Sequence, residues 1–282
     1  MSTPKNNMST PKKTKGAETA AETQPAALQK VEGATVNWEN YQGEYTGFEN
    51  VQESDLGIPF ITILQQKSAE VDKTHKDYAT KKIEGAEAGD LINTVTREIL
   101  AKAEKGFITV VPAFYEKTYV EWKPNRGGLV KVHRTEAILN EVTGKTEKNE
   151  SVLRNGNLLM ETMSFYVILI QDSQKSPAVI NMNSSALKAG RQWLNTMFNI
   201  KLGPQKVTPP MFSHHYILAT AIERKDNNAW YGWNIQIGDM VKSQELANQA
   251  VSIGSRVKVL SAPSKALAAS AAVSVAADEV PM

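Results

Sequence analysis

Aromatic and basic residues alternate along residues 113–123, a segment expected to form a β-strand. Because successive side chains of a strand point to opposite faces, one face would carry Tyr115, Lys117, Tyr119, Glu121 and Lys123. The other face would carry Phe114, Glu116, Thr118, Val120 and Trp122. Single-stranded nucleic acid is bound by rings that stack on its bases and cations that contact its phosphates. The pattern equally fits an ordinary exposed strand whose rings cover their neighbours, so both interpretations stay open.

Basic residues continue beyond this strand. The following turn and expected hairpin arm add Arg126, Lys131, His133 and Arg134. Residues 173–222 contain no Asp or Glu, although the chain has 30 acidic residues. The basic residues in this stretch are Lys175, Lys188, Arg191, Lys201 and Lys206. Such a stretch indicates a local positive field that the net charge of +2 conceals.

The clearest expected helix begins at Ser184 and Ser185, which are favourable N-cap residues, and runs to about residue 199. Its apolar residues Leu187, Leu194 and Met197 recur at helical spacing on one side. Lys188, Arg191 and Asn195 lie on the other side, and Trp193 lies near the boundary. This helix therefore predicts a second basic surface.

Catalytic chemistry has little support in the sequence. The chain has no cysteine, and its four histidines do not form a ligand or base motif. The fragment Glu121-Trp122-Lys123, with Asp90 upstream, resembles the carboxylate and lysine of some Mg²⁺-dependent nucleases. The same fragment is also a commonplace solvent-facing pair. We therefore expect a protein without catalytic residues, metal or cofactor, and keep the nuclease as an alternative.

Strands dominate the expected secondary structure. The patterns predict strands at 57–64, 91–95, 107–111 continuing to 122, 129–133, 161–170, 177–181, 215–223 and 230–237. Pro112 must lie at an edge or a bulge of the third strand. Besides the helix at 184–199, residues 246–253 predict a short helix. Runs of strands with few helices predict an α+β fold with a twisted, mainly antiparallel sheet, and an OB-like β-barrel is the alternative.

Composition divides the 282 residues into a body and two tails. Residues 1–36 have few apolar side chains, and residues 263–282 are rich in alanine and serine, so both predict disordered or low-complexity tails. The body, residues 37–262, is expected to be a single domain. No apolar run approaches the length of a membrane span, and the first residues do not resemble a signal peptide. We therefore expect no membrane partner.

Six segments resemble a family of tailed-bacteriophage proteins encoded among early genes: residues 57–65, 83–95, 108–122, 185–193, 209–212 and 230–233. Members of that family are described as single-stranded DNA-binding proteins. The sequence looks most like the Drc type, which also acts as a cofactor of a phage RNA polymerase and departs from the usual OB barrel. Many single-stranded DNA-binding proteins end in a long acidic tail, whereas only Asp278 and Glu279 occur here. The resemblance thus implies an activity class and no specific contacts.

Together these observations predict a sequence-tolerant single-stranded DNA-binding protein in the cytoplasm of a bacterial host, serving phage replication or transcription. The phosphate and base contacts are expected from Tyr115, Lys117, Tyr119, Trp122, Lys123, Arg126, Lys131, Arg134, Lys188, Arg191 and Trp193. Trp122 faces away from the tyrosines unless a bulge follows Pro112. The modest charge predicts a homo-oligomer, with replication proteins or a phage RNA polymerase as possible partners. The alternatives are the nuclease and a virion or scaffold protein.

Overall fold

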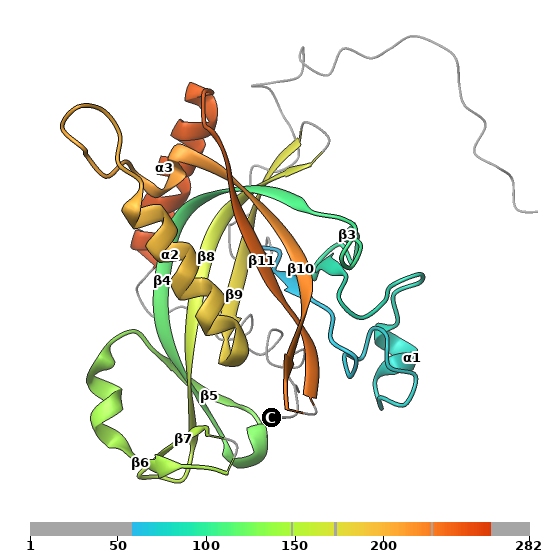
Figure 1. Cartoon of the computed structure of the whole chain (residues 1–282). Coiled ribbons are helices and arrows are strands. Elements are labelled where there is room, and N and C mark those ends of the chain that lie inside the picture. The colour runs from blue at the N-terminus through green and yellow to red at the C-terminus, as the bar shows by residue number, and fades with distance from the viewer. Residues whose placement is uncertain (1–57, 148, 172–173, 227, 261–282) are drawn as a thin grey trace, which may run out of the picture. The chain divides into compact units, whose positions relative to one another are not determined.

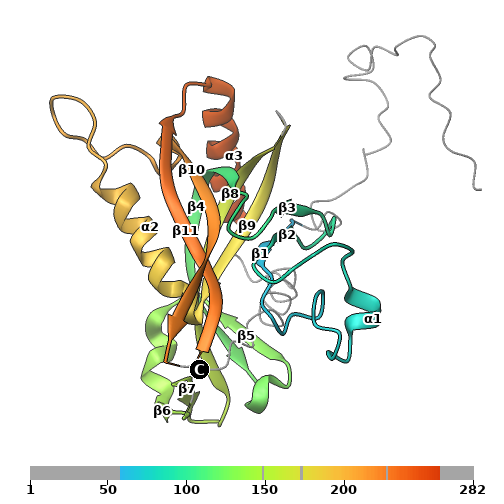
Figure 2. The same cartoon turned by 45° about the vertical axis from the view of Figure 1, so that its right-hand side comes forward.

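The computed structural model describes residues 58–147, 149–171, 174–226 and 228–260, all within the compact unit Val51–Met282. The two predicted tails, residues 1–36 and 263–282, lie outside the described residues. Figures 1 and 2 show long, strongly twisted strands accompanied by a few helices.

An eight-stranded sheet forms the centre of this unit, in the order β11-β10-β4-β8-β7-β6, with β5 paired to β4 and β9 paired to β8. Its strands are β4 (Ile108–Trp122), β5 (Leu129–His133), β6 (Val142–Lys145), β7 (Ser151–Leu153), β8 (Leu158–Gln171), β9 (Gln174–Asn183), β10 (His214–Lys225) and β11 (Asn228–Met240). Every strand pair in it is antiparallel. The predicted α+β fold with a mainly antiparallel sheet is confirmed, and the barrel alternative is wrong because the sheet does not close.

A smaller sheet contains β1 (Ile61–Ile63), β2 (Leu91–Asn93) and β3 (Ile99–Ala101). An isolated parallel bridge between Phe60 and Val179 connects its start to β9. The short helix α1 (Tyr78–Lys81) lies in the connection from β1 to β2. Sequence patterns predicted the first two of these strands but not β3, which is only three residues long.

Two longer helices cover opposite faces of β4 and β8. Helix α2 (Leu187–Asn199) follows a 3₁₀ turn at Ser184–Ala186, which confirms the helix predicted at 184–199. The predicted N-caps are wrong, because Ala186 is the N-cap of α2 and no side chain caps the helix. Helix α3 (Gln244–Leu260) is longer than the predicted segment 246–253. Further 3₁₀ turns lie at Pro124–Arg126, Glu136–Glu141 and Met211–Ser213.

The bulge predicted at Pro112 decides which helix each side chain of β4 faces. The register between β4 and β8 shifts between Pro112 and Phe114, so one extra residue enters β4. Before the bulge, Val111 packs in the cluster that includes Leu246 of α3. After it, Tyr115 packs in the cluster on the α2 side. The bulge thus turns the odd-numbered side chains of β4 from the α3 face to the α2 face.

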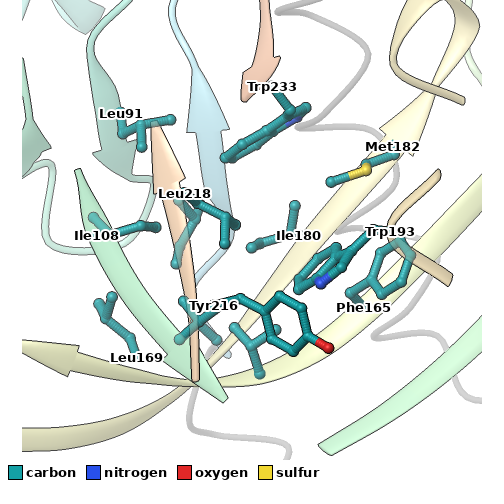
Figure 3. Packing of buried hydrophobic residues seen from close by; sticks show 14 of the residues in the cluster. Leu91, Ile108, Phe165, Leu169, Ile180, Met182, Trp193, Tyr216, Leu218 and Trp233 are labelled. Atoms are coloured by element: carbon teal, nitrogen blue, oxygen red, sulfur yellow. The ribbon is translucent and has the colours of Figure 1, made fainter. Parts of the chain in front are cut away.

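The main apolar core lies between α2, the large sheet and the small sheet (Figure 3). Phe165 and Ile180 of the central strands, together with Leu218 of β10, are completely buried in it. Ile61 and Leu91 reach it from the small sheet, so both sheets share one core. Burial of such side chains contributes about 1.5–3 kcal/mol each relative to exposure.

Gln65 connects the two sheets where the strands themselves do not pair. Its side-chain Nε2 donates to the Tyr231 carbonyl at 2.9 Å, and the Tyr231 backbone N–H donates to its Oε1 at 3.0 Å. Gln65 is only 8% exposed, so this double hydrogen bond replaces a strand pair in a site that water barely reaches. The Thr220 hydroxyl adds a second link by donating to the Gly89 carbonyl at 2.8 Å.

Replacing Gln65 by leucine is expected to lower the free energy of unfolding by about 1–3 kcal/mol, because both backbone groups of Tyr231 lose their partners. Urea unfolding followed by circular dichroism measures this loss. The exposed neighbour Gln66 provides the matched control, since Gln66→Leu removes no described hydrogen bond. Equal stability of the two variants would contradict the role assigned to Gln65.

Candidate nucleic-acid interface

The face predicted on β4 exists, but it is not an open surface. Pairing with β8 runs without a shift from Phe114 to Trp122, so Tyr115, Lys117, Tyr119 and Glu121 share one face. Trp122 lies on the opposite face, because the bulge precedes Tyr115 and leaves their relative orientation unchanged. The two sets of predicted stacking rings therefore cannot serve one strand of nucleic acid.

The aromatic rings of β4 are engaged in packing. Tyr115 is half-buried, and its ring centre lies 5.2 Å from that of Phe165. Tyr119 is 3% exposed and packs with Ile138, while Trp122 is 4% exposed and packs in a cluster with Leu129. Such burial leaves no ring face of Tyr119 or Trp122 for a base, so the structure places these residues in the core.

Most cations near this face already have carboxylate partners. Lys117 pairs with Glu136, whose hydrogen bond raises the pKa of Lys117. Arg126 pairs with Glu150 at 2.8 Å, and the Arg134 Nε lies 3.1 Å from Glu116. The exposed side chains of Lys123 and Lys131 take part in no ion pair identified within the described residues. A phosphate would have to compete with these carboxylates for the other three cations, which weakens the hairpin as a binding surface.

Glu121, the carboxylate of the nuclease hypothesis, is a buried hydrogen-bond acceptor. Its Oε1 accepts from Asn155 Nδ2 at 2.9 Å and Asn157 Nδ2 at 2.6 Å, and its Oε2 lies 2.7 Å from His133 Nε2. Burial raises the pKa of Glu121, but the hydrogen bonds from Asn157, Asn155 and His133 outweigh it, so the pKa is lowered overall. Within the described residues, no three His, Cys, Asp or Glu side chains form a group that could hold a metal ion. The structural role explains the residue without catalysis.

Because its pKa is lowered in the folded state, Glu121 contributes stability above its ordinary value of 4.5, and this is lost as the pH falls through the lowered pKa. Glu121→Gln is expected to cost about 1–3 kcal/mol at neutral pH, since the neutral amide offers Asn155 and Asn157 a weaker acceptor than the carboxylate and replaces the oxygen beside His133 with a donor. The difference from wild type should shrink below the ordinary pKa. Urea unfolding at several pH values tests this, with the exposed Glu141→Gln as control.

Helix α2 offers a different surface. Its inner side buries Gly190, Trp193 and Met197. At Gly190 a Cβ would come within 3.0 Å of Met163 Sδ and 3.1 Å of Met182 Sδ, so glycine allows the helix to lie close to the sheet. Trp193 is 1% exposed and stacks on Phe165, with the ring centres 4.4 Å apart. Trp193 is thus a core residue that fixes the helix, rather than an exposed stacking platform.

The outer side of α2 carries a row of exposed side chains, Lys188, Arg191, Asn195 and Phe198, which we call the α2 stripe. Their spacing of three or four residues places them on one side of the helix along about 15 Å. Phe198 is 70% exposed, the largest value among the exposed apolar side chains of the described residues. The Lys201 Nζ lies 5.0 Å from its ring centre. Cations, an amide and an open ring therefore follow one another along the helix.

The stripe borders an open groove of about 610 Å³, lined by Lys188, Arg191, Gln192, Asn195, Thr196, Asn199 and Ile200. No carboxylate belongs to this lining, and no acidic residue occurs between Ser173 and Ile222 in the sequence. Arg191 does contact Glu161 of β8, at 3.0 Å. The predicted basic residues Lys188 and Arg191 thus lie together on α2. Arg191 and Lys117 are both close enough to Tyr115 of β4 to act electrostatically on its hydroxyl.

Phe198 was not predicted, although the sequence contained a signal for it. The residue continues the spacing of Lys188, Arg191 and Asn195 by one further step, so a helix extended to residue 199 already places it on the same side. An apolar residue at the end of a helix is usually assigned to the core, and only the structure shows that this one is exposed.

The sequence of the chain matches a known protein family. The family model of Pam3 phage gp34-like proteins matches residues 23–262. The chain belongs to this family. The match covers most of the chain, including every element described above, and confirms the predicted bacteriophage origin. Single-stranded DNA binding and similarity to the Drc type stay predictions.

Two further comparisons add no relative to the gp34-like family match. Neither a curated protein nor a solved structure matches the chain. Among the helices of the described residues, none combines the length and apolar character that a membrane crossing requires.

Proposed function

We propose that this gp34-like protein binds single-stranded DNA in a sequence-tolerant manner through the α2 stripe, without catalysis. The observation that supports it is the row of Lys188, Arg191 and Asn195 along a groove whose lining contains no acidic residue, continued on the same side of α2 by the exposed ring of Phe198. Cations that follow the phosphates and an open ring for the bases are the elements of such surfaces. The proposed role is in phage replication, or in recruiting a phage RNA polymerase to melted promoters.

This proposal moves the main contacts from the β4 hairpin to α2. On the hairpin, Lys117, Arg126 and Arg134 pair with Glu136, Glu150 and Glu116, and their side chains are at most 35% exposed. Arg191 of α2 also pairs with a carboxylate, Glu161, but its side chain is 58% exposed. Lys123 and Lys131 keep exposed ammonium groups and provide secondary contacts for a longer strand. Because the stripe spans only a short helix, several subunits would act side by side, so we include a homo-oligomer in the proposal.

Fluorescence anisotropy with a labelled single strand of about 30 bases, and with its duplex, tests the proposal directly. We expect salt-sensitive binding that prefers the single strand, in EDTA and in Mg²⁺ alike, with the strand left intact. Lack of binding to either form at low salt would overturn the proposal and favour a virion or scaffold role. Mg²⁺-dependent cleavage that Glu121→Ala abolishes would instead support the nuclease.

Phe198→Ala is expected to weaken binding of the single strand by about 1–3 kcal/mol if the ring stacks on a base, and Phe198→Trp should retain it. The salt dependence of binding should stay unchanged, because no charge is removed. Phe107 is 60% exposed and directly precedes β4, so Phe107→Ala is the matched control for loss of an exposed phenylalanine that is not on α2. Equal affinities of the Phe198→Ala and Phe107→Ala variants would remove Phe198 from the interface.

A further inference from the structure

The groove beside the α2 stripe changes in chemistry along the helix. Its N-terminal part is lined by Lys188 and Arg191, the proposed phosphate contacts. Apart from Ile200, the rest of the lining is polar and uncharged and consists of Gln192, Asn195, Thr196 and Asn199. Contacts between cations and phosphates therefore involve only one part of the groove, and its C-terminal part offers neutral hydrogen-bonding groups.

Three of these residues form a group that we call the amide cluster: Gln192, Asn195 and Asn199. All three are exposed, and no hydrogen bond identified within the described residues uses their side chains. Their spacing of three and four residues makes them neighbours on the solvent side of α2, within about 10 Å along the helix. The cluster is thus a continuous surface of accessible donors and acceptors.

The amide cluster does not stabilise the fold. Carboxamides that do so have partners, as Asn155 and Asn157 have in Glu121. Asparagine is also a poor helix former, yet Asn195 lies in the interior of α2. Alanine at these exposed positions would favour the helix more. Residues that weaken local structure without a gain in packing are typical of functional surfaces.

Carboxamides match the edges of unpaired bases. Each carboxamide has an acceptor oxygen beside a donor NH₂ group. The Watson–Crick edge of every DNA base likewise has a donor next to an acceptor, in one order for adenine and cytosine and in the other for guanine and thymine. A carboxamide that turns over matches either order, so it accepts all four bases. These edges are accessible in a single strand, whereas base pairing occupies them in a duplex.

We infer that the amide cluster hydrogen-bonds the Watson–Crick edges of the bound strand and thereby selects single-stranded over duplex DNA. The inference rests on the proposed single-stranded DNA binding and names the groups that recognise the unpaired state. Lys188 and Arg191 contact phosphates, which both forms of DNA carry. The amide cluster adds contacts that only unpaired bases offer, and its tolerance of all four bases agrees with binding without sequence preference.

The triple variant Gln192→Ala/Asn195→Ala/Asn199→Ala tests the inference. Each lost hydrogen bond weakens binding about 2- to 10-fold, so we expect a mixed-sequence single strand to bind about 10-fold more weakly or worse. An abasic strand of equal length, and the duplex, should bind to the variant as they do to wild type. The dependence on salt should stay unchanged, because no charge is removed. The melting temperature should stay the same or rise, because alanine favours the helix.

The matched control is Gln66→Ala/Asn140→Ala, which removes two exposed carboxamides outside α2. We expect it to bind every strand as wild type does. Comparison of variant with wild type on each strand cancels the stacking of Phe198, which an abasic strand also loses. Anisotropy titrations with the three labelled DNAs measure all of these affinities.

The outcomes separate the two proposals. If no strand binds wild-type protein at low salt, the proposed function itself is overturned. If the mixed-sequence strand binds the triple variant and wild type alike, only the role of the amide cluster is overturned. Equal weakening of the mixed-sequence and abasic strands would place the amides on the sugar–phosphate backbone and overturn it as well. A clearly lowered melting temperature would show that these amides hold the fold together, which also contradicts the inference.

Discussion

Replacement of both Lys188 and Arg191 by alanine is expected to weaken single-stranded DNA binding about 25-fold at 0.1 M salt. Each phosphate contact contributes about 0.7 to the slope of log K against log salt for a single strand, so two contacts contribute about 1.4. If wild type and variant bind with equal affinity near 1 M salt, lowering the salt concentration tenfold to 0.1 M separates their affinities by about 25-fold. Anisotropy titrations at several salt concentrations measure the slope and the affinity together.

A charge-matched control distinguishes the stripe from the overall field of the protein. Lys73 and Lys76 lie in the connection between β1 and β2 and are exposed, so Lys73→Ala/Lys76→Ala removes the same charge away from α2. We expect this control to retain the wild-type slope. If both double variants lose affinity equally, binding depends on net charge alone and the stripe has no special role. If neither changes the slope, the phosphates contact another surface.

The sequence predicted the organisation of the strands and α2 because those signals are local. Alternation along residues 113–123 correctly placed Tyr115, Lys117 and Tyr119 on one face, and helical spacing correctly placed Lys188 and Arg191 together. Both inferences need only the period of a strand or helix. The bulge at Pro112 was also predictable, since proline cannot donate to the sheet.

The local sequence pattern could not predict which side chains are exposed and able to contact a ligand. Lys117, Arg134 and Arg126 find their carboxylates at Glu136, Glu116 and Glu150, which are 18–24 positions away in sequence. Tyr119 is buried because the 3₁₀ turn at Glu136–Glu141 brings Ile138 against it. The periodicity of a strand (two residues) or a helix (3.6 residues) carries no information about contacts between segments that are distant in sequence. Distant segments determine them, so the candidate site shifted from β4 to α2.

Trp193 is another residue whose burial the local sequence pattern did not predict. Its replacement has the second large expected effect, a loss of stability. Trp193→Ala is expected to lower the free energy of unfolding by about 3–5 kcal/mol, because it would leave a cavity beneath α2 in the main core. The indole contacts Phe165 and Tyr216, with ring centres 4.4 Å and 5.6 Å away, and is 1% exposed. Urea unfolding followed by circular dichroism measures the loss.

Trp193→Phe keeps most of this packing and should cost less, because the buried Trp193 Nε1 makes no hydrogen bond within the described residues that the change could remove. The exposed Phe198 lies one residue before the end of α2 at Asn199, so Phe198→Ala should leave the unfolding free energy nearly unchanged. A variant with Trp193→Ala that unfolds like wild type but no longer binds single strands would contradict the core assignment. In that case the original sequence-based interpretation, a tryptophan that stacks on bases, would regain its support over the packing role.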